Sequence, residues 1–307
     1  MPRALLCRAA AVAVALAAAV AVGSPSLSSQ GRTRALYVSV VDEMGAPVKG
    51  LGPADFVVRE DNTAREVLDV RPADDPMQIA VLVDNSAAAN PAIPDIRRAL
   101  PGFVDALVAK SEGAAGSNQV SIVTMAERPT ILANYTSNGD ELHKAIERVW
   151  SVTRSGNYLL DSTYEVLQGF KKREAARPVI VAVTTEGPEL SSRHYDDVVE
   201  ALRNSNAAYD VISFGRPGAG IDEQSRSRDI VLEEGPAVTG GWRDRLVTSQ
   251  ALGTRLQQLA DVLTHQYRVS YAHPDTLIPP DKVTVSARRQ DLTARGTLIK
   301  DAAPARQ

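Results

Sequence analysis

Three polar segments of this 307-residue chain carry side-chain oxygens near the ends of apolar runs. Asp84-Asn85-Ser86 directly follows the apolar run 79–83, and Thr185-Glu186-Gly187 follows the run 179–183. Ser155-Gly156-Asn157 lies just before a segment with helical spacing. In open α/β sheets, ligands collect outside the carboxyl ends of the strands. A carboxylate at residue 84 with a hydroxyl at residue 86 therefore stands where ligand and metal sites commonly occur.

Alternating strand and helix patterns predict the sheet that would bring these segments together. Apolar runs typical of strands cover 79–83, 119–125, 179–184 and 208–214, and helical spacing covers 93–109, 140–149, 159–170, 196–204 and 251–264. Strands separated by helices indicate right-handed crossovers, and uninterrupted apolar runs indicate strands that are covered on both faces. We predict an α/β fold with a doubly wound, mostly parallel sheet and helices on both faces.

Short strand patterns flank this region on both sides. The N-terminal ones cover 36–41, 56–60 and 66–70, with a hairpin signal at Asp61-Asn62, and the C-terminal ones cover 267–271, 282–287 and 297–300. Consecutive strands without a helix between them favour an antiparallel unit. We predict that an N-terminal β segment (35–75) and a C-terminal β segment (265–300) form one small all-β module, with the α/β domain (76–264) inserted between them.

The N-terminal residues have the pattern of a secretory signal. Arg3 and Arg8 begin it, an Ala/Val/Leu run covers 9–22, and a small, polar segment containing Pro25 ends it. The run is shorter than the roughly 20 residues that span a bilayer. We expect a signal peptide at 1–23, a flexible leader at 24–34, a short tail at 301–307, and a periplasmic or extracellular location. An uncleaved membrane anchor is the alternative.

Composition argues against several kinds of chemistry. A net charge of −3 and a pI near 5.9 give no support for binding nucleic acid or anionic membranes. The single cysteine, Cys7, lies within the expected signal peptide, so the exported chain would have no disulfide or thiolate site. The four histidines show no metal-binding spacing, and no Gly-x-Ser-x-Gly motif is present. The glycine-rich segment 215–220 lacks the lysine of a phosphate-binding loop and is expected to be a flexible surface loop.

The order and spacing of the polar segments resemble those of a von Willebrand factor type A domain protein, of the secreted bacterial type with a flanking β module. In that family a metal-ion-dependent adhesion site is built from Asp-x-Ser-x-Ser, a Thr in a second loop and the Asp of a Thr-Asp-Gly. The matching positions are residues 84–88 (Asp-Asn-Ser-Ala-Ala), 155–157 (Ser-Gly-Asn) and 185–187 (Thr-Glu-Gly). The resemblance extends to 51–60, to Thr239-Gly240-Gly241 and to 266–269, and so covers nearly the whole exported chain in order.

The resemblance implies a degenerate site for Mg²⁺ or Mn²⁺ formed by Asp84, Ser86, Asn157 and Glu186. Mg²⁺ prefers six oxygens in a near-octahedral array. Ala88 removes one of them, the residue at 157 offers an amide carbonyl in place of a hydroxyl, and the glutamate is longer than the expected aspartate. Two interpretations stay open. Either a divalent ion binds with a water molecule near Ala88, or the site is metal-free and Asp84 and Ser86 cap backbone N–H groups.

The function predicted from these features is non-enzymatic. We expect an exported, adhesion-type domain that engages a protein partner at the top of the sheet, through the degenerate site or the loops around it. The alternative is an exported α/β hydrolase or phosphate-handling enzyme with Asp84 as the reactive carboxylate, which would need a base or a cation beside it. A purely structural envelope component is a third possibility. Trp150 and Trp242 are expected to be packing residues.

Overall fold

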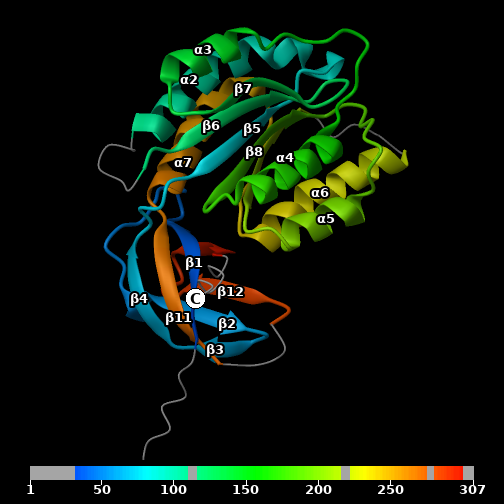
Figure 1. The fold of residues 1–307 in the computed structure, drawn as a ribbon. Coiled ribbons are helices and arrows are strands. Elements are labelled where there is room, and N and C mark those ends of the chain that lie inside the picture. Colours follow the sequence, from blue (N-terminus) through cyan, green and yellow to red (C-terminus); the bar gives the residue numbers. More distant parts are fainter. Residues whose placement is uncertain (1–31, 110–115, 216–221, 275–279, 300–307) are drawn as a thin grey trace, which may run out of the picture.

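The computed structural model describes residues 32–109, 116–215, 222–274 and 280–299, and Figure 1 shows their arrangement. The expected signal peptide, most of the expected leader and the C-terminal tail lie outside these residues, as does most of the expected glycine-rich loop. Among the described residues, no helix combines the length and the apolar character needed to cross a membrane.

A six-stranded sheet forms the centre of the larger part of the fold. Its strands, in spatial order, are β10 (Arg243–Leu246), β9 (Ala208–Phe214), β8 (Pro178–Thr185), β5 (Gln78–Val83), β6 (Gln119–Thr124) and β7 (Thr130–Thr136). Neighbouring strands are parallel except β6 and β7, which are antiparallel. The predicted doubly wound, mostly parallel sheet is therefore confirmed. Because β5 and β8 are adjacent and parallel, the segments that follow them emerge at the same edge.

Helices cover both faces of this sheet (Figure 1). One layer consists of α2 (Ile93–Ala109), α3 (Gly139–Glu147) and α7 (Leu252–Thr264), and the other of α4 (Leu159–Arg173), α5 (Tyr195–Arg203) and α6 (Glu223–Thr239). Ile79, Val81 and Val83 of β5 pack in the core beneath the first layer, and Ala80 and Leu82 in the core beneath the second. Both sides of β5 are buried, which explains its continuous apolar sequence.

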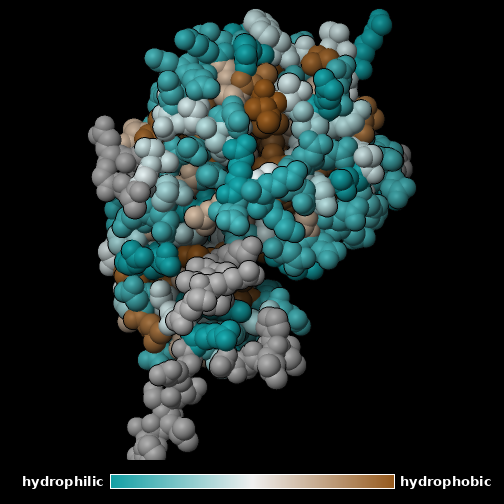
Figure 2. Space-filling model, in the orientation of Figure 1, coloured by the Kyte–Doolittle hydropathy of each residue, from teal (hydrophilic) through white to brown (hydrophobic). Residues whose placement is uncertain are grey.

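Three elements of the α/β region were not predicted from the sequence: β7, β10 and α6. The two strands lie at the edges of the sheet, and Ile131 of β7 is 61% exposed. Figure 2 shows hydrophobic residues gathered close to where Figure 1 labels β7. Val231 and Leu232 are the large aliphatic side chains that α6 buries. Partly exposed strands and a polar helix give weak periodic patterns, which explains why they were missed.

Segments from both ends of the described chain build a separate all-β module, as predicted. One sheet has the order β13 (Thr293–Leu298), β1 (Arg32–Val41), β11 (Tyr267–His273) and β4 (Val67–Pro72), and the other β12 (Val283–Ala287), β2 (Phe56–Glu60) and β3 (Thr63–Arg65). Every pair of neighbouring strands is antiparallel. Asp61 and Asn62 both have positive φ angles, as a tight hairpin turn between β2 and β3 requires.

Several contacts hold the module against the α/β region, and two of them involve Arg177 and Gly240. Arg177 is buried where the chain passes between them, and its guanidinium donates to the backbone oxygens of Ala73 and Asp75 at 3.1 and 2.9 Å and to Gln266 Oε1 at 2.6 Å. At the second contact, Gly240 has a φ of +75°, and a Cβ there would lie 2.0 Å from the carbonyl oxygen of Gly296 in β13. The Thr-Gly-Gly segment thus ends α6 in a conformation that allows the module to approach closely.

Candidate functional site

Asp84 lies at the carboxyl end of β5 and is fully buried. Its Oδ1 accepts a hydrogen bond from the backbone N–H of Ser86 at 2.9 Å. Its Oδ2 accepts from Thr185 twice, from the backbone N–H at 3.0 Å and the hydroxyl at 2.8 Å, and from Asn157 Nδ2 at 3.2 Å. The carboxylate thus joins three loops through neutral donors. The predicted capping of backbone N–H groups by Asp84 is confirmed.

Asn157 brings the second loop to this carboxylate. Its backbone N–H donates to the carbonyl of Pro188 and its carbonyl accepts from the N–H of Leu190, both at 2.8 Å. These bonds hold the second loop against the segment that follows β8. The side-chain Nδ2 donates to Asp84 and also to Thr184 Oγ1 at 2.9 Å, while Oδ1 is buried and has no hydrogen-bond partner.

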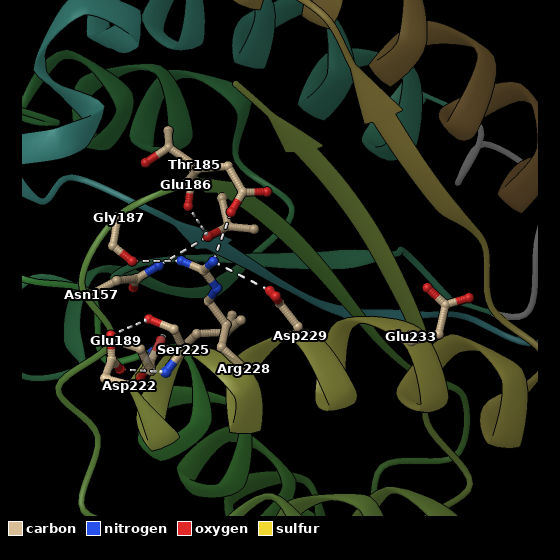
Figure 3. Close-up of polar contacts among 12 residues, drawn as sticks. Asn157, Thr185, Glu186, Gly187, Glu189, Asp222, Ser225, Arg228, Asp229 and Glu233 are labelled. Atoms are coloured by element: carbon tan, nitrogen blue, oxygen red, sulfur yellow. Dashed lines mark hydrogen bonds and ion pairs between the residues drawn. The ribbon is translucent and has the colours of Figure 1, made fainter. Parts of the chain in front are cut away.

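Glu186 pairs with Arg228 of α6 (Figure 3). Arg228 Nη2 lies 2.7 Å from Glu186 Oε2, and Nη1 donates to the carbonyl of Gly187 at 2.6 Å. The exposed fractions of the two side chains are 4% for the arginine and 9% for the glutamate. Among the described residues, no hydrogen bond joins Glu186 to Asp84, Ser86 or Asn157. The sequence predicted a carboxylate here, but not the cation that neutralises it.

Arg228 was missed because it belongs to α6, the helix with the weak apolar pattern. Asp222 precedes the helix, and its side chain accepts from the backbone N–H of Ser225 at 2.8 Å. Such a bond satisfies a free N–H group at a helix start. The acid at residue 222 was visible in the sequence and is the signal that could have located this helix. Arg228 follows within the next turns and reaches the loop after β8.

Ser86 and Ala88 complete the first loop, which continues into the 3-10 helix η2 (Ala87–Ala92). Ser86 Oγ is buried and makes no hydrogen bond, so the expectation that it caps a backbone N–H is wrong. A Cβ built on Gly187 would lie 2.6 Å from the Cβ of Ala88, which means that the first and third loops are in close contact. The methyl group of Ala88 therefore packs against a backbone where the family has a hydroxyl.

The residues present do not fit a resident divalent ion in this arrangement. The described part of the chain contains no cluster of three or more His, Cys, Asp or Glu side chains that could hold a metal. Both oxygens of Asp84 already accept hydrogen bonds, and Glu186 is neutralised by Arg228. Ser86 Oγ and Asn157 Oδ1 are the buried oxygens without partners at this place, and both are neutral. Two neutral oxygens are a poor ligand set for Mg²⁺.

The alternative of an enzyme with a reactive Asp84 would need a base beside that carboxylate, and none of the histidines in the described residues forms a hydrogen bond or an ion pair with it. Within the described residues, His143 contacts Asp105, His194 contacts Asp196, His265 contacts the carbonyl of Asp261 and His273 contacts Glu60. Burial raises the pKa of Glu189 to about 7. However, its carboxylate accepts hydrogen bonds from the N–H groups of Leu159 and Ser191, so it supports the loop before α4.

Three large apolar side chains are exposed in segments that border the central sheet or follow its strands. Trp150, in the segment between α3 and α4, is 63% exposed; Leu190, after β8, is 50% exposed; and Val247, after β10, is 88% exposed. We call these three side chains the apolar rim. Asn85 Nδ2 donates to the carbonyl of Trp150 at 3.0 Å, which ties the first rim residue to the loop after β5. The expectation that Trp150 is a packing residue is wrong.

Comparisons with known proteins agree with this fold. A family model described as the von Willebrand factor type A domain matches residues 78–239, more than half of the chain. No curated protein matches. Among solved structures, a von Willebrand factor type A protein from Catenulispora acidiphila is 10% identical, with a TM-score of 0.49 over 89% of this chain and 74% of that one.

Two further solved structures are matched over nearly all of their own length. The von Willebrand factor domain of the type V pili tip protein Mfa5 from Porphyromonas gingivalis is 8% identical, with a TM-score of 0.46 over 61% of this chain and 95% of that one. The protein BatB from Bacteroides thetaiotaomicron is 15% identical, with a TM-score of 0.44 over 62% and 99%. Likenesses this distant carry no argument about partners, so the family assignment rests on the family model.

Proposed function

Because the chain belongs to the von Willebrand factor type A domain family, we propose that it is an exported, non-enzymatic binding protein of adhesion type, which engages a protein partner at the top of its central sheet. The observation that carries this proposal is the apolar rim of Trp150, Leu190 and Val247, together with the buried network of Asp84. Contiguous exposed apolar patches mark interaction surfaces, and the capture experiment below tests whether these side chains act as one.

We propose further that partner binding needs no metal. Four hydrogen bonds from neutral groups hold the Asp84 carboxylate, and the guanidinium of Arg228 supplies the positive charge beside Glu186. The four residues Asp84, Ser86, Asn157 and Glu186 then act as a structural support for the loops. The sequence also left open the binding of Mg²⁺ or Mn²⁺ by these four residues, and calorimetry distinguishes that interpretation from the metal-free one.

The proposed organisation keeps the boundaries expected from the sequence, with a β module from 35–75 and 265–300 and a binding domain from 76–264. Support comes from Arg177 and Gly240, which fix the module at the end of the sheet away from the rim. The signal-like residues 1–23 support export to the periplasm or the extracellular space.

A capture experiment tests the proposal. The immobilised full chain is incubated with an envelope fraction of the producing cell, and bound proteins are identified with and without EDTA. The double variant Leu190→Asp/Val247→Asp should lose the captured partner, because it places charge on the apolar rim. Leu68→Asp, at a 47% exposed position of the β module, is the matched control and should retain it. Equal capture by the rim variant and the control would refute the proposal, and loss of capture in EDTA would refute its metal-free form.

A further inference from the structure

A groove of about 570 Å³ lies beside the apolar rim, between the first turns of α2 and the C-terminal end of α3. Ile93 and Ile146, both buried, contribute apolar side chains to it. Pro94, Arg97 and Pro101 line its α2 side at spacings of three and four residues, so they lie on one face of the helix. Trp150 and Ser151 line it on the side of the rim.

From this groove we infer the chemistry of the partner: it binds an acidic peptide segment that carries an apolar side chain. This inference rests on the proposed function and names the class of partner. The apolar side chain contacts Trp150 and the groove floor, and a carboxylate of the segment pairs with Arg97.

The Arg97–Trp150 pair is the centre of the groove. The guanidinium carbon of Arg97 lies 4.2 Å from the centroid of the Trp150 ring, within the range of a cation–π interaction. Among the described residues, Arg97 forms no ion pair, so its charge remains available to a carboxylate. Tryptophan and arginine are enriched among the interface residues whose replacement by alanine weakens binding most. A tryptophan that is 63% exposed and held by an arginine is already arranged as such an anchor.

The charges along the groove favour an acidic rather than a basic occupant. Arg97 and Arg98 face it, against the single carboxylate of Glu147. Asp95 partly compensates Arg98 at 2.8 Å, and His143 contacts Asp105 at 2.9 Å. Because Arg98 is paired with Asp95, Arg97 is the arginine of the lining that has no ion pair among the described residues, and it supplies the positive charge for an acidic occupant. Local charge of this kind steers oppositely charged partners and rejects like-charged ones.

The groove wall is fixed by the loop that carries Asp84 and Ser86. Asn85 bonds the Trp150 segment twice, through Nδ2 to the carbonyl of Trp150 at 3.0 Å and through its own carbonyl to the N–H of Val152 at 2.8 Å. Ser151 Oγ donates to the carbonyl of Ser86 at 3.0 Å. A wall held by three hydrogen bonds loses little freedom when a peptide binds, which favours affinity.

The test uses the full chain and a library of short fluorescein-labelled peptides, each with one central aromatic or leucine residue flanked by acidic, neutral or basic residues. Fluorescence anisotropy should detect binding of acidic members, weaker at high salt. Arg97→Glu and Trp150→Ala should each weaken binding at least about tenfold. Arg203→Glu, at an exposed arginine of α5, is the matched control and should change little. Circular dichroism verifies that each variant folds.

The outcomes separate this inference from the proposed function. Equal binding of acidic and basic peptides, or unchanged affinity in Arg97→Glu, would refute the groove assignment. If the envelope partner is still lost in the Leu190→Asp/Val247→Asp variant, the proposed function stands without the groove. If acidic peptides bind through Arg97 but the rim variant captures the envelope partner as well as the control does, the proposed function fails.

Discussion

Two buried carboxylates, one at each end of the molecule, are held in different ways. Glu60 of the β module accepts from Arg65 Nε at 2.9 Å, from Tyr271 Oη at 3.0 Å and from His273 Nδ1 at 2.8 Å. Asp84 accepts from backbone, hydroxyl and amide groups and has no cation among these donors. The first network links β-strands through an ion pair, whereas the second joins loops at the carboxyl edge of the central sheet.

The two networks differ in the position of the cation that compensates the buried negative charge. In the β module the cation contacts the buried acid directly. At the sheet edge the cation, Arg228, contacts Glu186 and leaves Asp84 to neutral donors. A buried charge is costly unless it is paired or well hydrogen-bonded. Both solutions satisfy this requirement, and each can be broken separately.

The largest effect is expected at Glu60. Glu60→Ala removes the acceptor of Tyr271, His273 and Arg65, and breaking a buried ion pair from one side typically costs about 3–5 kcal/mol. We expect a loss of this size in the free energy of unfolding, measured by urea denaturation. Glu66→Ala, at an exposed position in the same module, should change stability by less than about 1 kcal/mol. A loss at Glu60 as small as at Glu66 would mean that the network contributes little.

Asp210 sharpens the comparison, because it is a buried carboxylate with little compensation. Its Oδ1 accepts from the N–H of Trp242 at 2.8 Å, Oδ2 has no hydrogen-bond partner, and burial raises the pKa to about 7. Between its ordinary pKa of 3.8 and about 7, the folded state binds more protons than the unfolded state, so stability falls as pH rises. The contribution is on the order of 1.4 kcal/mol per unit of pKa shift.

Unfolding free energies measured from pH 4 to pH 8 test this expectation. Asp210→Asn mimics the protonated carboxyl and should flatten the decline in stability over that range. Asp69→Asn, at an exposed position of β4, should leave the slope unchanged. Identical slopes in Asp210→Asn and the unmutated chain would show that Asp210 does not titrate in this window.

A smaller effect is expected at Arg228. Arg228→Met keeps most of the side-chain volume but removes the charge-assisted hydrogen bond to Glu186, and such bonds contribute about 1.5–3 kcal/mol. Adding Glu186→Gln should recover part of the loss, because the buried carboxylate, which then keeps only the more distant Arg245 at 3.9 Å, is made neutral. A double variant that is less stable than Arg228→Met alone would contradict the role of the arginine as the compensating cation.

The smallest effect, an absence of saturable heat, is expected when a divalent metal is titrated into the protein. Isothermal titration of the unmutated chain with Mn²⁺ or Mg²⁺ should give no saturable heat, and Asp84→Ala should behave in the same way. A saturable heat that disappears in Asp84→Ala would restore the degenerate site as a metal site. The comparison with Glu60 would then change, because a metal would supply the missing cation at Asp84.

The sequence by itself determined the elements that have strong apolar patterns. The helix predicted at 93–109 has those bounds in the structure, and the strand predicted at 208–214 does as well. Both are buried over a whole face or more, so their periodicity is strong. The meeting of Asp84 with Thr185 also follows from the sequence, because segments after adjacent parallel strands emerge at one edge.

Only the tertiary structure decided which groups those side chains contact. Glu186 pairs with Arg228 because α6 packs beside the loop after β8, and no local pattern links residues 186 and 228. Trp150 stays exposed because hydrogen bonds from Asn85 and an arginine from α2 hold it at the surface. Apolar periodicity determines which faces are buried, whereas the pairing of polar side chains depends on contacts between residues far apart in the chain.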